Sequence, residues 1–117
     1  MLHHVAIPVP SGNLDACEAF YTALGFASVE PPEGLRGRAR WLQHGGTQIH
    51  LLIEEDAGPL PGGAHLAVVA SDYEEALERL TALGADVEPR RQHWSSPRAY
   101  VHDPAGHLVE VMAWPPA

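Results

Sequence analysis

Three histidines and one glutamate stand at matching places in the two halves of this chain. His65 follows His4 by about sixty residues, and Glu110 follows His50 by about the same interval. Each half therefore carries one of these residues early and another about 45 residues later. Imidazole nitrogens and carboxylate oxygens are the donors that Zn, Fe, Ni, Co and Mn accept in proteins. The four residues are predicted to ligate one divalent metal ion, whose identity the pattern leaves open.

His50 and Glu110 are polar residues inside apolar, strand-like runs. Residues 46–53 read GTQIHLLI, and Glu110 stands between Val109 and Val111. A desolvated imidazole or carboxylate costs free energy unless a hydrogen bond, an open strand face or a metal ion satisfies it. A single buried histidine is usually satisfied by the protein itself. Four such residues in register favour a shared metal site.

The ligand set has two alternatives among neighbouring residues. His3 is able to replace His4, although the strand face that His3 shares is otherwise apolar. Gln48 lies on the same strand face as His50 and is able to replace or assist it.

Two groups of residues are candidates for binding an anionic substrate. Arg98 and Tyr100 share a face of one predicted strand, from which they would reach a substrate carboxylate or oxyanion. An exposed hairpin face explains these two residues equally well. Arg36, Arg38 and Arg40 also alternate, and a solvated strand face is the simpler interpretation of these three arginines.

The elements that must position these residues are repeated as well. Residues 22–25 and 81–84 both read TALG, and each copy closes an apolar stripe of helical spacing. A strand that begins with histidine precedes each helix, over residues 4–9 and 65–69. The terminal glycines favour left-handed helix caps, and Ser71 and Glu74 have the spacing of a capping box at the second helix.

The order of elements predicts an α+β fold of two paired modules. Residues 98–102 and 107–113 flank the turn sequence DPAG and are expected to form a hairpin. Each half then reads as a strand, a helix and several strands, over about residues 1–57 and 63–117. Neither half would readily bury its own apolar face, so the two are expected to pair into a single domain.

Composition excludes several classes of protein. The 117 residues carry a formal charge of −8, which argues against nucleic acid as a partner. No long apolar run indicates a signal peptide or a membrane helix, so no membrane partner is expected. The only cysteine, Cys17, lies in a helical apolar stripe and gives no sign of disulfides, so we expect a cytoplasmic protein.

With these features the chain resembles the vicinal oxygen chelate superfamily, which includes glyoxalase I, extradiol dioxygenases and bleomycin-resistance proteins. The resemblance rests on LHHVAIPV, AFYTALGF, QIHLL, HLAVVASD and RAYVHDPAGHLVEV. It implies two βαβββ modules that curl into one cup-shaped mixed sheet with the helices outside, a divalent metal at the base, and a homodimer. The implied ligands are His4, His50, His65 and Glu110. His107 is a departure, because asparagine usually follows this turn.

The resemblance implies a metal-dependent lyase or isomerase that chelates adjacent oxygens of a small-molecule substrate and stabilises an enediolate. Glu110 is then the base, and His50 stands where glyoxalase I has a carboxylate, which argues against glutathione as substrate. The first alternative is an extradiol dioxygenase, with His4, His65 and Glu110 as an iron triad and His50 as an acid–base group. The second is a metal-free binding protein like the bleomycin-resistance members.

Overall fold

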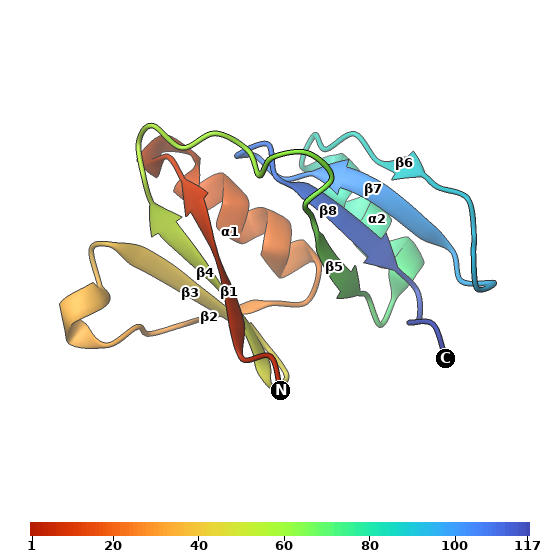
Figure 1. Cartoon of the computed structure of the whole chain (residues 1–117), viewed down its shortest axis with the longest axis horizontal. Coiled ribbons are helices and arrows are strands. Elements are labelled where there is room, and N and C mark those ends of the chain that lie inside the picture. The colour runs from red at the N-terminus through yellow and green to blue at the C-terminus, as the bar shows by residue number, and fades with distance from the viewer. The chain divides into compact units, whose positions relative to one another are not determined.

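Each half of the chain builds its own sheet, covered on one face by one helix (Figure 1). The computed structural model describes residues 1–117. They divide into two compact units, Met1–Gly58 and Pro59–Ala117, which we call module 1 and module 2. Both modules run strand, helix and three strands, which is the predicted α+β arrangement of βαβββ modules.

Module 1 contains a four-stranded mixed sheet of order β1-β4-β3-β2. The edge strand β1 runs parallel to β4, whereas β3 is antiparallel to both β4 and β2. Ile7 and Val9 of β1 share a face with Leu51 of β4, and all three are buried. The elements are β1 (His4–Val9), a 3-10 turn (Ser11–Asn13), α1 (Leu14–Ala23), β2 (Ala27–Val29), a second 3-10 turn (Glu33–Leu35), β3 (Ala39–His44) and β4 (Thr47–Ile53).

Module 2 repeats this topology with the order β5-β8-β7-β6. Here β5 runs parallel to β8, and β7 is antiparallel to both β8 and β6. The predicted strand at 65–69 begins one residue later, so His65 immediately precedes β5. The elements are β5 (Leu66–Val69), α2 (Tyr73–Ala82), β6 (Glu88–Pro89), β7 (Arg98–His102) and β8 (Leu108–Met112).

The C-terminal ends of both helices agree with the prediction, whereas the N-terminal cap of α2 differs from it. Gly25 and Gly84 have φ angles of +103° and +92°, the left-handed conformation expected after each helix. The capping box predicted from Ser71 and Glu74 is wrong. Asp72 is the N-cap of α2, and its Oδ1 accepts a hydrogen bond from the backbone N–H of Glu75 at 3.1 Å. The true pair has the same spacing one residue later, with aspartate as the capping acceptor.

The predicted hairpin forms between β7 and β8. Asp103 Oδ1 accepts hydrogen bonds from the backbone N–H groups of Ala105 and His107, both at 2.9 Å, and Gly106 takes a φ of +89°. The His107 side chain is fully buried, and its Nδ1 accepts from the backbone N–H of Leu60 at 3.2 Å. His107 therefore ties the segment that leads into β5 to the hairpin turn.

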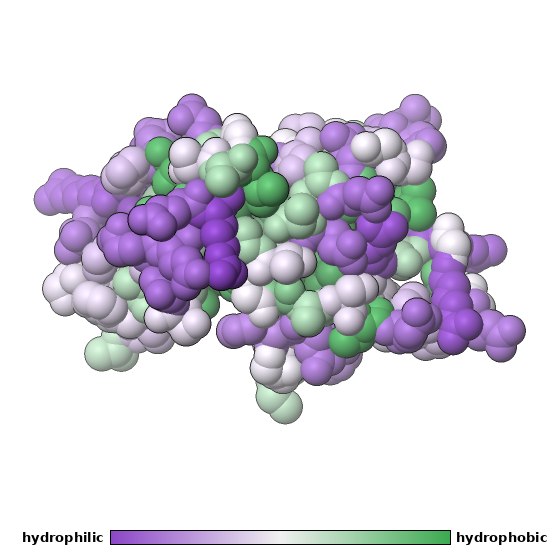
Figure 2. All heavy atoms as spheres, turned by 180° about the vertical axis from the view of Figure 1, so that it is seen from behind, coloured by the Kyte–Doolittle hydropathy of each residue, from purple (hydrophilic) through white to green (hydrophobic).

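Hydrophilic residues cover most of the face shown in Figure 2, with smaller hydrophobic patches among them. This agrees with a sequence that has 15 acidic and 7 basic residues.

No helix of the structure has the length and apolar character needed to span a membrane.

Replacing His107 with alanine should destabilise the protein by about 2 kcal/mol, because the amide of Leu60 loses its acceptor and a buried ring is removed. Replacing it with asparagine, which keeps an acceptor oxygen, should recover part of this loss. Urea denaturation of both variants would measure the free energy of unfolding. An unchanged value for His107→Ala would contradict the anchoring role.

Candidate functional site

The strand register builds a matching row of three side chains in each module. In both rows a small edge-strand residue and an aromatic residue of the third strand lie opposite a polar residue of the central strand. In parallel and antiparallel pairing alike, directly opposite residues point to the same face of a sheet. The rows are Ala6–His50–Trp41 in module 1 and Ala67–Glu110–Tyr100 in module 2.

His50 is buried, with 6% of its surface exposed, between two flat rings. The Trp41 ring stacks on it at a centroid distance of 4.0 Å and 1° between planes, and the His4 ring at 4.0 Å and 17°. Gln48 donates from Nε2 to Gln43 Oε1 at 2.8 Å, which turns its own Oε1 toward His50. His50 Nε2–H donates to that oxygen at 2.8 Å. Gln48 therefore assists His50, as one of the sequence alternatives proposed.

The surroundings favour the neutral form of His50. Burial lowers the pKa of the imidazole, and the nearby His4 and His3 rings lower it further. Since Nε2 carries the proton that bonds Gln48, the lone pair of the neutral ring lies on Nδ1. His50 thus presents Nδ1 as a base or as a ligand atom.

His4, rather than His3, is the residue placed beside His50. The Nδ1 atoms of His3 and His4 are 2.9 Å apart, and their rings meet edge to face at 5.2 Å. Only the His4 ring stacks on His50. The register places Gln48 directly opposite His4 on β4, so these three polar side chains share one face of the sheet.

In module 2, Glu110 is buried in an ion pair. Its Oε2 accepts from Arg98 Nη1 at 3.3 Å, and each side chain is only 9% exposed. Arg98 Nε donates to the carbonyl oxygen of Arg91 at 2.8 Å. The guanidinium also lies 5.8 Å from the Trp94 ring centroid and 5.5 Å from that of Tyr100. An exposed hairpin face is therefore wrong for Arg98, whose buried charge is used to neutralise Glu110.

His65 is oriented by the backbone in front of β5. Its Nδ1–H donates to the carbonyl oxygen of Gly63 at 2.8 Å, so the lone pair of the neutral ring lies on Nε2. A hydrogen bond of this kind fixes the tautomer of many metal-binding histidines. The His65 ring also lies 5.9 Å from the Tyr100 ring. Tyr100 thus contacts both His65 and Arg98.

The arginines near β3 are engaged in surface ion pairs. Arg40 Nη1 bonds Asp15 Oδ1 at 2.6 Å and lies 3.4 Å from Glu18 Oε2, both on α1. Arg36 pairs with Glu30 at 3.2 Å. These ion pairs agree with the solvated interpretation that the sequence favoured over an anion site. The predicted strand face of three alternating arginines is wrong, because Arg36 and Arg38 lie in the turn before β3.

The imidazole and carboxylate groups of the four predicted ligands suit a divalent metal ion, but the rings of His4 and His50 are not both oriented to bind the same ion. Two of the four predicted ligands lie in each module, and neither module alone groups three or more donor side chains. His65 offers Nε2, and Glu110 Oε1 has no hydrogen-bond partner, so both are ready to ligate. The rings of His4 and His50 are stacked with their centroids 4.0 Å apart, so their in-plane lone pairs lie in two nearly parallel planes. One of the two would have to rotate before both bound a single ion.

Comparisons with known proteins agree with this fold. The sequence profile of the glyoxalase-like domain matches residues 6–112. A protein of Bacillus anthracis assigned to the glyoxalase family is 29% identical, with a TM-score of 0.82 over 96% of this chain and 93% of that one. A lactoylglutathione lyase of Agrobacterium tumefaciens is 23% identical, with a TM-score of 0.66 over 96% and 92%.

A bleomycin-resistance determinant encoded on the transposon Tn5 is 22% identical, with a TM-score of 0.64 over 92% of this chain and 94% of that one. A search of curated proteins found no match. The similar structures thus include both an enzyme and a resistance protein, so the fold alone leaves the reaction open. Because the profile covers nearly the whole sequence, from β1 to the end of β8, this chain belongs to the glyoxalase-like domain family.

Proposed function

We propose that this chain is a metal-dependent enzyme that moves a proton at a carbon beside a carbonyl group of a small molecule, as a glyoxalase-type lyase or isomerase does. His4, His65 and Glu110 are the metal ligands in this proposal, and His50 is the base. The observation that carries it is the position of His50. A buried imidazole, fixed in one tautomer by Gln48, occupies the same place in its row that Glu110 occupies in module 2.

The proposed ligands have the chemistry that a divalent ion requires. His65 is held in the Nε2 lone-pair tautomer by Gly63, and Arg98 holds one carboxylate oxygen of Glu110 and leaves the other available. A bound divalent ion would supply a Lewis acid that polarises a substrate carbonyl. Gly63 and Arg98 orient the donor atoms of His65 and Glu110 before a metal ion binds, which reduces the entropy cost of ordering these side chains on binding.

The role of base passes from Glu110 to His50. The sequence assigned it to Glu110, as a carboxylate that either moves off the metal or holds a metal-bound water. The ion pair with Arg98 opposes that movement, because a buried carboxylate that leaves its partner is left uncompensated. His50 has a lone pair on Nδ1 and a fixed ring, and a positioned base of this type contributes about 10²–10⁴ in rate.

The second candidate reaction is extradiol ring cleavage, and the position of His50 favours it. Two histidines and a carboxylate with an acid–base histidine beside them are also the residues of an extradiol dioxygenase site for Fe(II). His50 suits that role as well, since it need not bind metal. Oxygen consumption by iron-loaded protein on catechols would identify this alternative, whereas proton exchange without oxygen uptake supports the isomerase.

The ligand assignment predicts that His65→Ala loses its metal ion and stays folded. His65 is exposed, and its only hydrogen bond is the one to Gly63. His102→Ala, an exposed histidine of β7, is the matched control and should keep its metal. Elemental analysis after purification, with circular dichroism to check folding, measures both. Full occupancy in His65→Ala would refute the assignment, and a wild-type chain that binds no divalent metal would favour a binding protein.

The proposed base predicts a specific pattern for His50→Ala. Metal affinity should stay close to that of the wild type, while turnover should fall about 10²–10⁴-fold. Gln48→Ala should lower turnover less, because it frees the tautomer but keeps the imidazole. Calorimetric titration with metal and steady-state rates on a carbonyl substrate separate the two effects. Loss of metal in His50→Ala would show that His50 is a ligand, and unchanged turnover would show that it is not the base.

The buried ion pair predicts a large loss of stability in Arg98→Met. Leaving Glu110 buried without its partner should lower the free energy of unfolding of the metal-free protein by about 3 kcal/mol. The double variant Arg98→Met/Glu110→Leu should regain most of this loss, since neither charge is then left unpaired. Arg90→Met, which removes an exposed arginine stacked on Tyr100, is the control. Equal unfolding midpoints for the wild type and Arg98→Met would contradict the assigned role.

A further inference from the structure

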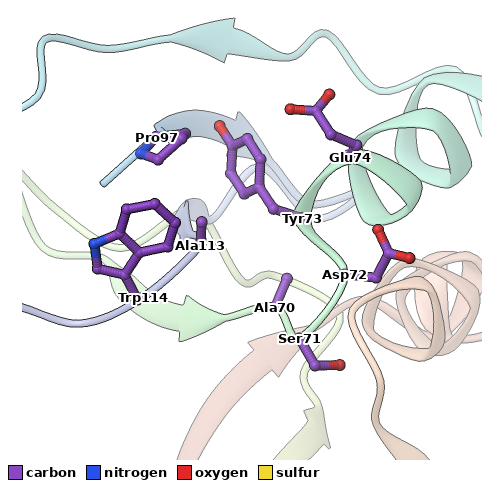
Figure 3. Close-up of a pocket in the computed structure, with 8 residues that line it drawn as sticks. All are labelled: Ala70, Ser71, Asp72, Tyr73, Glu74, Pro97, Ala113 and Trp114. Carbon is purple, nitrogen blue, oxygen red and sulfur yellow. The ribbon is translucent and has the colours of Figure 1, made fainter. Parts of the chain in front are cut away.

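Module 2 contains a pocket of about 320 Å³ that lies apart from the proposed metal ligands and the proposed base. It opens where β5 ends, α2 begins and β8 runs into the C-terminal segment (Figure 3). No predicted metal ligand, and neither Arg98 nor Tyr100, lines it. The lining residues are Ala70, Ser71, Asp72, Tyr73, Glu74, Pro97, Ala113 and Trp114.

Two of the lining residues, Tyr73 and Trp114, are aromatic. Figure 3 shows the indole of Trp114 and the phenol ring of Tyr73 on either side of Ala113, with Ala70 below them. The Trp114 residue is half exposed, yet its backbone is fixed at both polar groups. Its N–H donates to Ser96 Oγ at 3.1 Å, and its carbonyl oxygen accepts from Trp94 Nε1 at 2.9 Å. The half-exposed indole of Trp114 therefore projects from an anchored backbone and offers a large aromatic face to a ligand.

The charges that line the pocket are all negative. Asp72 and Glu74 are exposed carboxylates, and no arginine is among the lining residues. Asp72 uses one oxygen to cap α2, while Glu74 has no ion-pair partner. Burial raises the pKa of the Tyr73 hydroxyl, and the negative charge of Glu74 raises it further. Two full charges outweigh the helix N-terminus, which contributes about half a positive charge. The pocket therefore repels anions and attracts cations.

We propose that this pocket binds a small organic cation, namely an ammonium group that carries apolar substituents. The faces of Tyr73 and Trp114 attract a cation through their ring quadrupoles, and indole is the strongest aromatic partner for such a group. Asp72 and Glu74 supply the opposite charge, and Pro97 and the two alanines contact apolar substituents. A metal ion would leave these apolar walls unused. This inference does not depend on the proposed enzymatic function.

Choline and its neutral isostere 3,3-dimethyl-1-butanol test the proposal on the full chain in the presence of EDTA. The two probes have the same shape and differ in charge. Tryptophan fluorescence and calorimetric titration should show saturable binding of choline, at least about tenfold tighter than that of the alcohol. Benzoate, an anion of similar size, should not bind. Equal binding of choline and the alcohol, or no saturable binding of choline, would overturn the proposal.

Variants then locate the bound cation. Trp114→Leu should weaken choline binding about tenfold, and Glu74→Gln should weaken it about threefold, because that charge is exposed. Tyr73→Phe keeps the ring and should bind like the wild type. His65→Ala should also bind choline normally. Choline binding that is lost in His65→Ala and unaffected by both Trp114→Leu and Glu74→Gln would place the cation elsewhere and refute the assignment to this pocket.

Discussion

A polar side chain in the middle of a sheet must find a partner, and this requirement organises both modules. His50 and Glu110 occupy the central strands β4 and β8, where each neighbouring strand is hydrogen-bonded through its backbone. The backbone groups on either side are thus already used in the strand ladders. Each polar group has to be satisfied by side chains on its own face of the sheet. The alanine on one side of the row and the aromatic residue on the other define the space in which that happens.

The two modules satisfy their buried polar side chains in different ways, with a neutral partner for His50 and a charged partner for Glu110. A neutral imidazole loses little on burial, so one amide oxygen and two stacked rings are sufficient for His50. An ionised carboxylate loses far more, and Glu110 has a buried guanidinium that itself lies within cation–π distance of Trp94 and Tyr100. A repeat with one topology therefore holds a neutral imidazole in one half and a carboxylate paired with an arginine in the other.

The sequence was sufficient to predict most helices and strands, and to predict which candidate residues share a strand face. Periodicity and turn residues located β1, α1, α2 and the β7–β8 hairpin, because these features depend on local conformational preferences. Alternation along the strands also places Ala6 on the face of His4 and Ala67 on the face of His65. The cap at Asp72 was missed by one residue, since two capping acceptors stand side by side there.

The partners across the strands were harder to predict, because they depend on register. Arg98 reaches Glu110 only because the short turn between β7 and β8 sets Tyr100 opposite Glu110, which makes Arg98 a diagonal neighbour. The length of that turn was a usable signal for this contact. The stack of Trp41 on His50 likewise follows from the β3–β4 pairing. The anchoring of Leu60 by His107 joins segments 47 residues apart, and no local pattern indicates it.

The alanine in each row also decides from which side a ligand can approach. Trp41 and Tyr100 close the β3 and β7 sides of their rows with large rings, whereas Ala6 and Ala67 are exposed and end at Cβ. His50 and Glu110 are almost fully buried, so the open direction lies over the edge strands β1 and β5. His4 belongs to β1 and His65 immediately precedes β5. His4 and His65 are exposed, and each stands on the side from which the buried polar residue of its module can be reached, which is why we propose these two histidines as metal ligands.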